Sequence, residues 1–197
     1  MDKINDFKDL NFLFIEFFDI DLESVDIRDL DSKIPSELRF MYKIREINSN
    51  KGNKLLFNRQ DELIPYDQLD LDKQKFDFIF ENQSCWTLQT ELNKSQPKVY
   101  QDGTDEIGYL KDFIITYILQ EFTFSLEYVN YDISFSIENL KSKFICIEPL
   151  WTGKKYVYRK NRYNFYLAED KGIAFIIPED DISFFGTNSK EMSNLIK

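Results

Sequence analysis

The chain has 197 residues, of which 43% are hydrophobic and 30% are charged, a composition typical of a folded globular protein and not of a disordered or membrane-spanning one. Its 35 acidic and 25 basic side chains give a net charge of -10, which disfavours nucleic acid or an anionic membrane as the main partner because phosphates would be repelled. The sequence contains no histidine, which excludes Ser-His-Asp and Cys-His catalysis, histidine-containing zinc sites and a pH switch built on imidazole.

Two helices are predicted in the first quarter of the chain. Apolar residues recur at steps of three and four from Ile4 to Phe17, which indicates an amphipathic helix, although the apolar run 11–18 also fits a buried strand. Pro35 suits the first position of a second helix because its missing N–H is no loss there. The polar run 48–50 is expected to end this helix, since its side chains compete with the backbone for hydrogen bonds.

Short strands separated by polar turns are predicted from about residue 55 to residue 100. Pro65 and Pro97 are expected in loops or at sheet edges, because proline cannot donate to a strand ladder. The second and third strands are expected to pair as a hairpin across a polar turn at 81–83. The predicted strands cover residues 55–57, 76–80, 84–88 and 96–100.

A third helix is predicted near the middle of the chain, and strands are predicted after it. A third helix is expected to begin at 104–106, where a hydroxyl can cap and acids fall in the first turn, and its apolar stripe runs from Ile107 to Phe122. The sequence beyond residue 130 fits either an extension of the first sheet or a separate small one. It contains predicted strands at 133–137, 144–147, 155–159, 162–167 and 173–177, a tight turn at Lys160 and Asn161, and a short final helix at 189–196.

The cysteines and the N-terminus predict a cytoplasmic protein. Cys85 and Cys146 form no CxxC pair and no disulfide framework, so a reducing compartment is expected, and both lie in apolar runs that favour buried, inert thiols. The first six residues lack a basic region, and the apolar stretch 12–18 is interrupted by Glu16, so no signal peptide is expected. No run approaches the ~20 apolar residues that a membrane span needs.

Two charged segments are candidates for a binding site. The acids of 19–23 alternate, but an EF-hand loop from Asp19 requires glycine and glutamate where Ser24 and Leu30 stand, so a solvated acidic face is predicted. The basic segment 154–162 is interleaved with aromatic residues, as in proteins that bind single-stranded nucleic acid, but its charges gather near a hairpin turn, where they protect strand ends or contact another chain. No catalytic, cofactor-binding or metal-binding residue is predicted.

Short motifs between residues 30 and 125 resemble, in their order, those of the SUKH superfamily, which includes bacterial immunity proteins and fungal regulators of cell-wall synthesis. Pro35, Asn82, Trp86 and Pro97 are the markers of this resemblance; they imply a fold and identify no partner-binding residue. The motifs are IPSELRFMY at 34–42, IPYDQL at 64–69, FIFENQ at 78–83 followed by WTL at 86–88, PKVY at 97–100 and YLKDF at 109–113.

The resemblance implies an α+β fold with a twisted, mostly antiparallel sheet flanked by helices. One SUKH-like domain is expected over residues 1–197, with its core at about 30–125 and a β-rich extension at 130–197. The implied function is that of a non-enzymatic immunity protein, which needs no cofactor and neutralises a cognate toxin, such as a nuclease, by covering it. The alternatives are a hydrolase that uses two converging carboxylates and a regulatory scaffold of the fungal type.

Overall fold

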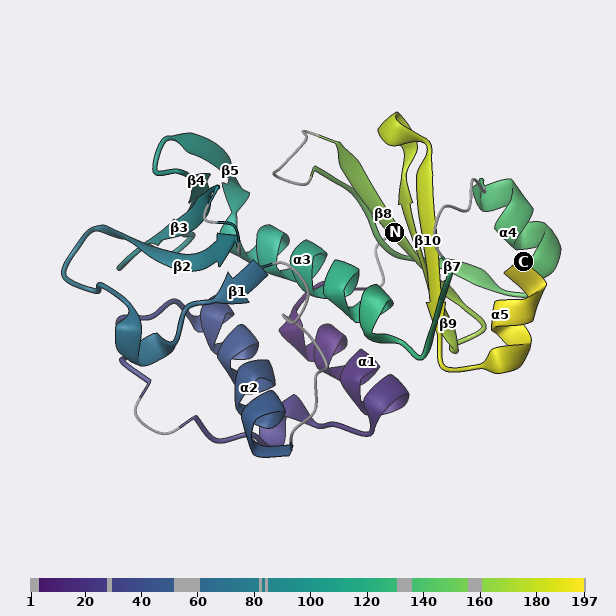
Figure 1. Cartoon of the computed structure of the whole chain (residues 1–197), viewed down its shortest axis with the longest axis horizontal. Helices are drawn as coiled ribbons and strands as arrows, with labels where there is room; N and C mark the ends of the chain where they lie inside the picture. The colour runs from purple at the N-terminus through teal and green to yellow at the C-terminus, as the bar shows by residue number, and fades with distance from the viewer. Residues whose placement is uncertain are drawn as a thin grey trace. The chain divides into compact units, whose positions relative to one another are not determined.

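The structure, a computed structural model, divides the chain into two compact units (Figure 1). The first unit contains residues 21–114, and the second contains residues 1–20 and 115–197. Each unit has its own antiparallel sheet. The residues described are 4–27, 30–51, 61–81, 83, 85–130, 136–155 and 161–196.

The first unit contains a five-stranded sheet in the order β1-β2-β3-β4-β5, so each strand pairs with its neighbour in the sequence. The hairpin expected between the strands near 76–80 and 84–88 is confirmed as β2 and β3. The strands are β1 (Asp61–Leu63), β2 (Lys75–Glu81), β3 (Thr87–Glu91), β4 (Lys98–Gln101) and β5 (Asp105–Tyr109). The helical elements are η1 (Leu22–Ser24), α2 (Ser36–Lys51), η2 (Tyr66–Gln68) and the start of α3 (Leu110–Ser125).

One face of this first sheet is buried against helices. Alternate residues along β3 and β4 are buried, as the period of a strand requires, and β2 follows the same pattern except at a register shift where Phe78 and Ile79 are both buried. The ring of Phe78 in β2 packs edge-on against Phe113 of α3, with 5.9 Å between the ring centroids. The buried side chains on this face are Phe76, Phe78, Leu88, Thr90 and Val99.

Helix α2 begins immediately after Pro35, whose carbonyl accepts the first helical hydrogen bond from the Leu38 amide at 3.0 Å. The prediction of a second helix here is confirmed, although the helix continues through 48–50 to Lys51. Two side chains fasten α2 to the strand β1 and its following loop. The hydroxyl of Tyr42 donates to the carbonyl of Ile64 at 3.0 Å, and the guanidinium of Arg45 donates to the carbonyl of Leu63.

The second unit contains a separate sheet in the order β6-β10-β9-β8-β7, so residues beyond 130 do not extend the first sheet. Its strands are β6 (Tyr128–Asn130), β7 (Ile147–Lys155), β8 (Arg162–Ala168), β9 (Gly172–Ile177) and β10 (Ile182–Thr187). Its helical elements are α1 (Phe7–Phe18), the part of α3 from residue 115, α4 (Ile137–Lys143), η3 (Pro178–Asp180) and α5 (Lys190–Ile196).

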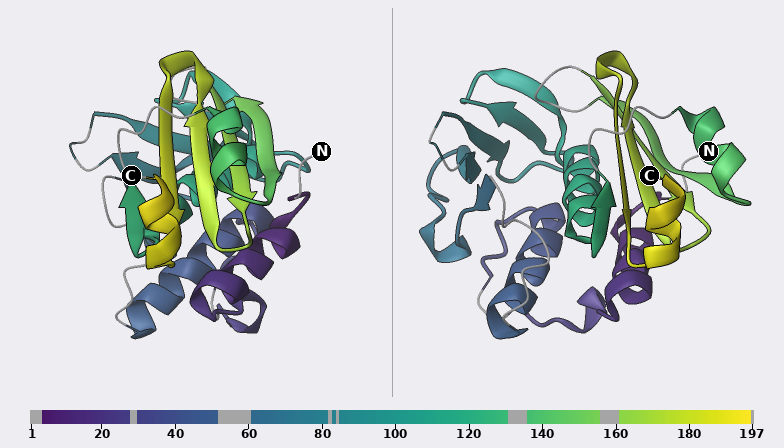
Figure 2. Two further views of the ribbon diagram at one scale, coloured as in Figure 1. Left: turned by 90° about the vertical axis from the view of Figure 1, so that its right-hand side faces the viewer. Right: turned by 45° about the vertical axis from the view of Figure 1, so that its right-hand side comes forward.

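Helices cover both faces of this second sheet (Figure 2). On one face, Phe165, Phe175 and Phe184 are direct cross-strand partners whose rings stack at 4.7 and 5.6 Å, and Phe124 of α3 packs on them. On the other face, α4 and α5 bury a cluster in which the rings of Phe144 and Phe185 stack at 5.3 Å. Burial on both faces explains the continuous apolar sequence of β9.

Helix α1 confirms the amphipathic pattern read from Ile4 to Phe17, so the alternative of a buried strand at 11–18 is wrong. The side chain of Asp6 caps the helix by accepting from the amides of Lys8 and Asp9. Asp19 ends it in the left-handed conformation, with a φ of 55°.

Several boundaries differ from the prediction. The third helix does not begin at 104–106, because residues 105–109 form β5, and α3 starts at Leu110. The strand expected at 133–137 is wrong at its end, where Ser136 caps α4, and residues 131–135 lie outside the described part. The strand expected at 144–147 is wrong except at Ile147, which begins β7.

Other expected elements are confirmed or untested. The strands predicted at 162–167 and 173–177 and the final helix are present as β8, β9 and α5. The strand predicted at 55–57, most of that at 155–159 and the Lys160 position of the turn lie outside the described residues. The α+β class is confirmed, whereas a single SUKH-like domain over residues 1–197 stays a prediction.

Candidate interaction surface

The four marker residues occupy different parts of the first unit. Pro35 precedes α2, Pro97 is buried immediately before β4, and Trp86 is half-buried immediately before β3. Asn82 lies outside the described residues. Pro97 lines a surface pocket to which the helix after Pro35 also contributes, whereas Trp86 does not line it.

The face of the first sheet opposite α2 and α3 is polar, and it is named here the outer face. In the described part of the first unit, no helix packs on it. Its side chains are mostly half-buried, because they lie against one another across the strands. The outer face consists of Lys75, Asp77, Gln89, Glu91, Lys98, Tyr100 and Glu106.

Cross-strand contacts fix the side chains of the outer face. The amide of Gln89 donates to the carboxylate of Asp77 at 2.9 Å, and the ammonium of Lys98 lies 2.7 Å from the carboxylate of Glu106. The ammonium of Lys75 lies 3.3 Å from the ring centroid of Tyr100. The outer face is therefore an ordered polar surface in which charged groups of both signs are already positioned.

Two pKa shifts reflect these neighbours. The carboxylate of Glu106 raises the pKa of the Lys98 ammonium above its usual value, because the hydrogen bond between them favours the charged lysine. Desolvation raises the pKa of the Tyr100 hydroxyl, and the nearby charge of Glu91 raises it further. Lys98 and Tyr100 therefore both keep their protons throughout the neutral range.

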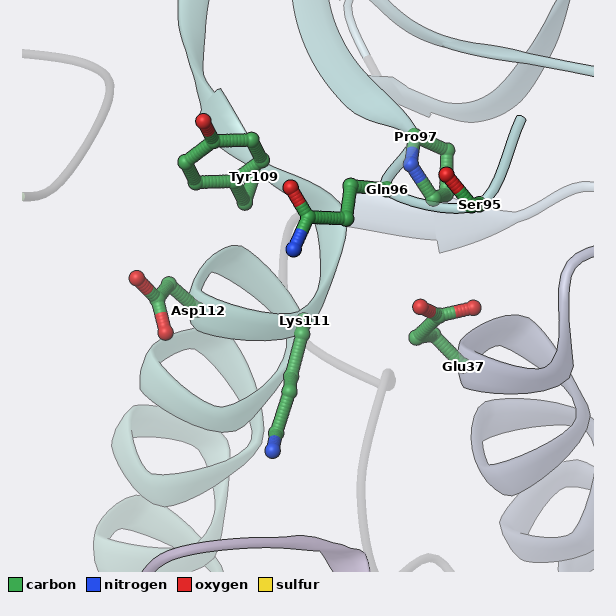
Figure 3. Close-up of a pocket in the computed structure, with 7 residues that line it drawn as sticks. All are labelled: Glu37, Ser95, Gln96, Pro97, Tyr109, Lys111 and Asp112. Carbon is green, nitrogen blue, oxygen red and sulfur yellow. The ribbon is translucent and has the colours of Figure 1, made fainter.

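A pocket of about 300 Å³ opens at the edge of the outer face (Figure 3). Tyr109 connects the two features, because it lies directly opposite Lys98 in the ladder and its side chain therefore faces the same side of the sheet. Glu37 comes from the first turn of α2, and Lys111 and Asp112 come from the first turn of α3. The lining residues are Glu37, Ser95, Gln96, Pro97, Tyr109, Lys111 and Asp112.

Within the described part of the chain, the Glu37 carboxylate and the Lys111 ammonium of the pocket do not pair with each other. Among the described residues, neither Glu37 nor Lys111 forms an ion pair, and the Glu37 carboxylate accepts a 3.2 Å hydrogen bond from the Ser36 hydroxyl. Figure 3 shows the Glu37 side chain directed toward the Gln96 loop, the Lys111 side chain running along α3 away from Gln96, and the Asp112 carboxylate pointing away from Glu37. The two carboxylates do not converge as those of a hydrolase do.

The acidic segment 19–23 has a structural role. Asp19 ends α1, and the Asp21 carboxylate caps η1 by accepting from the Glu23 amide at 2.9 Å. Asp19, Asp21 and Glu23 are exposed, so the predicted solvated acidic face is confirmed. Within the described part of the chain, no group of three or more carboxylate or cysteine side chains is arranged to hold a metal ion.

The basic segment 154–162 does not present its described aromatic residues for base stacking. Trp151 and Tyr163 are only 3% and 6% exposed, and Lys154 lies 4.5 Å from the ring centroid of Trp151. Arg162 pairs with Glu179 at 2.7 Å, which lowers the pKa of that carboxyl. The other residues of the segment, 156–160, lie outside the described part.

The prediction of buried cysteines is wrong, because the side chains of both Cys85 and Cys146 are exposed. Cys85 lies in the turn between β2 and β3, and Cys146 lies in the loop before β7, so neither belongs to the apolar strand that its neighbours suggested.

The sequence pattern did not identify the outer face or the pocket. The outer face could have been inferred from the polar residues that alternate along β2, β3 and β4. The pocket could not, because its lining comes from three segments separated by more than ten residues each.

Of the helices described, none has the length and apolar character that crossing a membrane requires. Comparisons with protein-family models, with curated proteins and with solved structures found no match.

Proposed function

We propose that the protein is a non-enzymatic binding protein of the SUKH type, which acts in the cytoplasm as an immunity protein and neutralises a cognate toxin by covering it. The observation that carries this proposal is the outer face. An antiparallel sheet commonly packs one face on its core and exposes the other, and here the exposed face holds its charged and aromatic groups in fixed positions. Such preorganisation favours binding, because little side-chain freedom is lost on association.

Charge supports a basic partner. Residues 21–114 carry 19 of the acidic and 13 of the basic side chains, so the unit with the outer face is itself negative. Enzymes that act on polyanions, such as nucleases, present positive surfaces to their substrates, and an acidic inhibitor matches such a surface. Complementary charge mainly accelerates encounter and selects the partner, so the association rate is expected to fall as salt is added.

Among the described residues, two carboxyl groups have shifted pKa values, and both shifts are those of surface ion pairs and not those of the catalytic acid of a hydrolase. The pKa values of Asp70 and Glu179 are lowered by hydrogen bonds from Lys73 and Arg162, respectively. A glycosidase-type hydrolase instead needs one carboxylic acid whose pKa is raised, so that it can donate a proton. Asp70 and Glu179 therefore do not supply such an acid.

The proposal expects the neighbouring upstream gene to encode a large protein with a C-terminal toxin domain, and the first experiment is co-expression of this chain with that protein. The proposal predicts that growth is restored and that the two proteins copurify. Full toxicity in cells that contain soluble protein would count against the proposal.

Titration of the purified toxin separates a binder from a hydrolase. A covering inhibitor abolishes toxin activity at an equimolar ratio and stops there, because each molecule occupies one toxin. A hydrolase that destroys the toxin or its product acts at substoichiometric amounts, and its effect grows with time. Time-dependent, substoichiometric protection would therefore overturn the binding proposal.

A further inference from the structure

The pocket at the edge of the outer face contains an exposed aromatic ring beside an acidic group. Tyr109 is 50% exposed, although the other large side chains of the first unit are mostly buried. It lines the pocket together with the half-buried Glu37 and the exposed Gln96. Tyrosine is one of the residue types enriched among the positions that contribute most to protein–protein binding.

Among the described residues, no cation pairs with the negative charge of Glu37. Glu37 lies in the first turn of α2, where the unsatisfied backbone N–H groups stabilise a carboxylate. For the same reason Asp112 is stabilised in the first turn of α3. Since Glu37 forms no ion pair within the described residues, its charge stays available to a ligand.

Lys111, the cation among the described residues that line the pocket, does not occupy the space beside Glu37. Figure 3 shows the Lys111 side chain running along α3, away from Gln96 and Tyr109. The pocket lining at Glu37, Gln96 and Tyr109 therefore includes a carboxylate, a side-chain amide and an aromatic ring. A planar guanidinium can use all three, because it donates to oxygens in its plane while its flat surface stacks on an aromatic ring.

We infer that this pocket holds an arginine side chain of the partner protein, with its guanidinium between the Glu37 carboxylate and the Tyr109 ring. The inference rests on the proposed function, since the partner is the toxin that the outer face covers. The pocket then provides the anchor at one edge of the contact. The acidic balance of the first unit, which favours a basic partner, points in the same direction.

A small probe tests the pocket without the toxin. Nα-acetyl-L-arginine amide is titrated into the 15N-labelled full chain at low salt, and Nα-acetyl-L-citrulline amide, which has the same shape without the charge, is the control ligand. We expect saturable shifts of the Gln96, Tyr109 and Lys111 amide signals with the arginine probe alone. Equal shifts with citrulline, or no saturable shift, would overturn the inference.

Three variants test whether the pocket recognises the positive charge of the probe. Glu37→Gln should weaken probe binding about tenfold, because a charge-assisted hydrogen bond is lost. Lys111→Gln should tighten it about twofold, because a like charge is removed. Glu62→Gln, which removes an exposed acid of β1 outside the pocket, should leave it unchanged. Weaker binding by Lys111→Gln, or unchanged binding by Glu37→Gln, would show that the pocket does not bind a cation in this way.

Protection of cells by the wild-type chain, compared with its binding of the arginine probe, separates the two proposals. If the wild-type chain protects cells and the arginine probe does not bind, the pocket inference fails and the proposed function stands. If the probe binds as expected and the wild-type chain gives no protection, the proposed function fails, and the arginine does not belong to such a toxin.

Discussion

The indole N–H of Trp151 donates a hydrogen bond of 2.9 Å to Oγ1 of Thr116, which joins β7 to α3 inside the second unit. Trp151 is 3% and Thr116 1% exposed. This bond satisfies the single donor of a buried indole. Because the indole ring is buried, Trp151 is unable to act as a platform for nucleic acid bases despite its basic neighbours.

Replacing Thr116 by valine should destabilise the protein, because it keeps the side-chain shape and leaves the buried indole N–H without this acceptor. The expected loss is about 1–3 kcal/mol in the free energy of unfolding, measured with urea. Thr104→Val, at an exposed threonine in the turn before β5, is the matched control and should change little. Equal stability of Thr116→Val and the wild-type chain would mean that the bond contributes nothing.

Local patterns predicted helices α1 and α2 well, but they misplaced the start of α3 and did not predict α4. Helices α1 and α2 follow from apolar spacing and from Pro35. The start of α3 was misplaced because the acids at 105 and 106 resemble a first helical turn. The stronger signal was the Asp102-Gly103 pair, whose φ angles of 48° and 79° form the turn of the β4–β5 hairpin.

The second sheet shows the limit of local prediction. Strand β10 lies between β6 and β9, so it is hydrogen-bonded along both of its edges. Its pairing with β6 joins residues nearly sixty positions apart in the sequence. The buried polar residues Ser183 and Thr187 interrupt the apolar sequence of β10, so β10 lacks the continuous apolar run that marks β9 as a strand. The pocket could not be predicted from the sequence either, because no local motif links Glu37, Gln96 and Tyr109.

Two glycines of the second sheet should differ in how their replacement is tolerated. A Cβ at Gly172 would strike the ring of Phe185, whereas a Cβ at Gly186 would strike the backbone carbonyl of Thr123 in α3. Both alanine variants should lose about 1–3 kcal/mol in urea unfolding. Phe185→Leu should offset part of the loss in Gly172→Ala, because the obstacle is a side chain.

No side-chain truncation removes the obstacle at Gly186. The double variant Gly186→Ala with Phe185→Leu should therefore be at least as unstable as the sum of the single changes. Rescue of Gly186→Ala by Phe185→Leu would contradict the assignment of its clash to the α3 backbone.

Tyr42 should make stability fall at high pH. Burial raises the pKa of its hydroxyl above the usual value, against the smaller effect of Arg45, and the hydroxyl donates to the Ile64 carbonyl at 3.0 Å. Below pH about 10 the tyrosine is neutral in both states, so its contribution is fully present. Above that pH the unfolded chain releases the proton and the folded chain keeps it, so the free energy of unfolding decreases.

The variant Tyr42→Phe tests this origin of the pH dependence. It should lose about 1 kcal/mol at pH 7, because the hydrogen bond to the Ile64 carbonyl is missing. Its stability should then decline less than that of the wild-type chain between pH about 9 and 11, whereas both should change equally between pH about 7 and 8.5. Parallel decline of the two chains above pH 9 would assign the effect to other tyrosines.

Tyr100 of the outer face should matter for binding more than for folding. Its ring is half-buried and lies under the Lys75 ammonium, at the centre of the surface proposed to meet the toxin. Tyr100→Leu should weaken the complex about tenfold in a titration calorimeter. Tyr66→Leu, at a half-buried tyrosine of η2 outside the outer face, is the control, and urea unfolding verifies that both variants fold. Unchanged affinity of Tyr100→Leu would move the contact away from the outer face.

The single domain expected over residues 1–197 has a direct test, because each unit contains one of the two tryptophans, Trp86 and Trp151. Helix α3 crosses the boundary at residue 114, so neither unit retains all of its helical core if the other unfolds. We expect both units to unfold in one cooperative transition.

In Trp86→Phe the fluorescence reports on the second unit alone, and in Trp151→Phe on the first unit. In each variant the fluorescence midpoint in urea should coincide with the midpoint from far-ultraviolet circular dichroism, which reports on both units. A fluorescence midpoint that differs from the dichroism midpoint would show two domains that unfold separately.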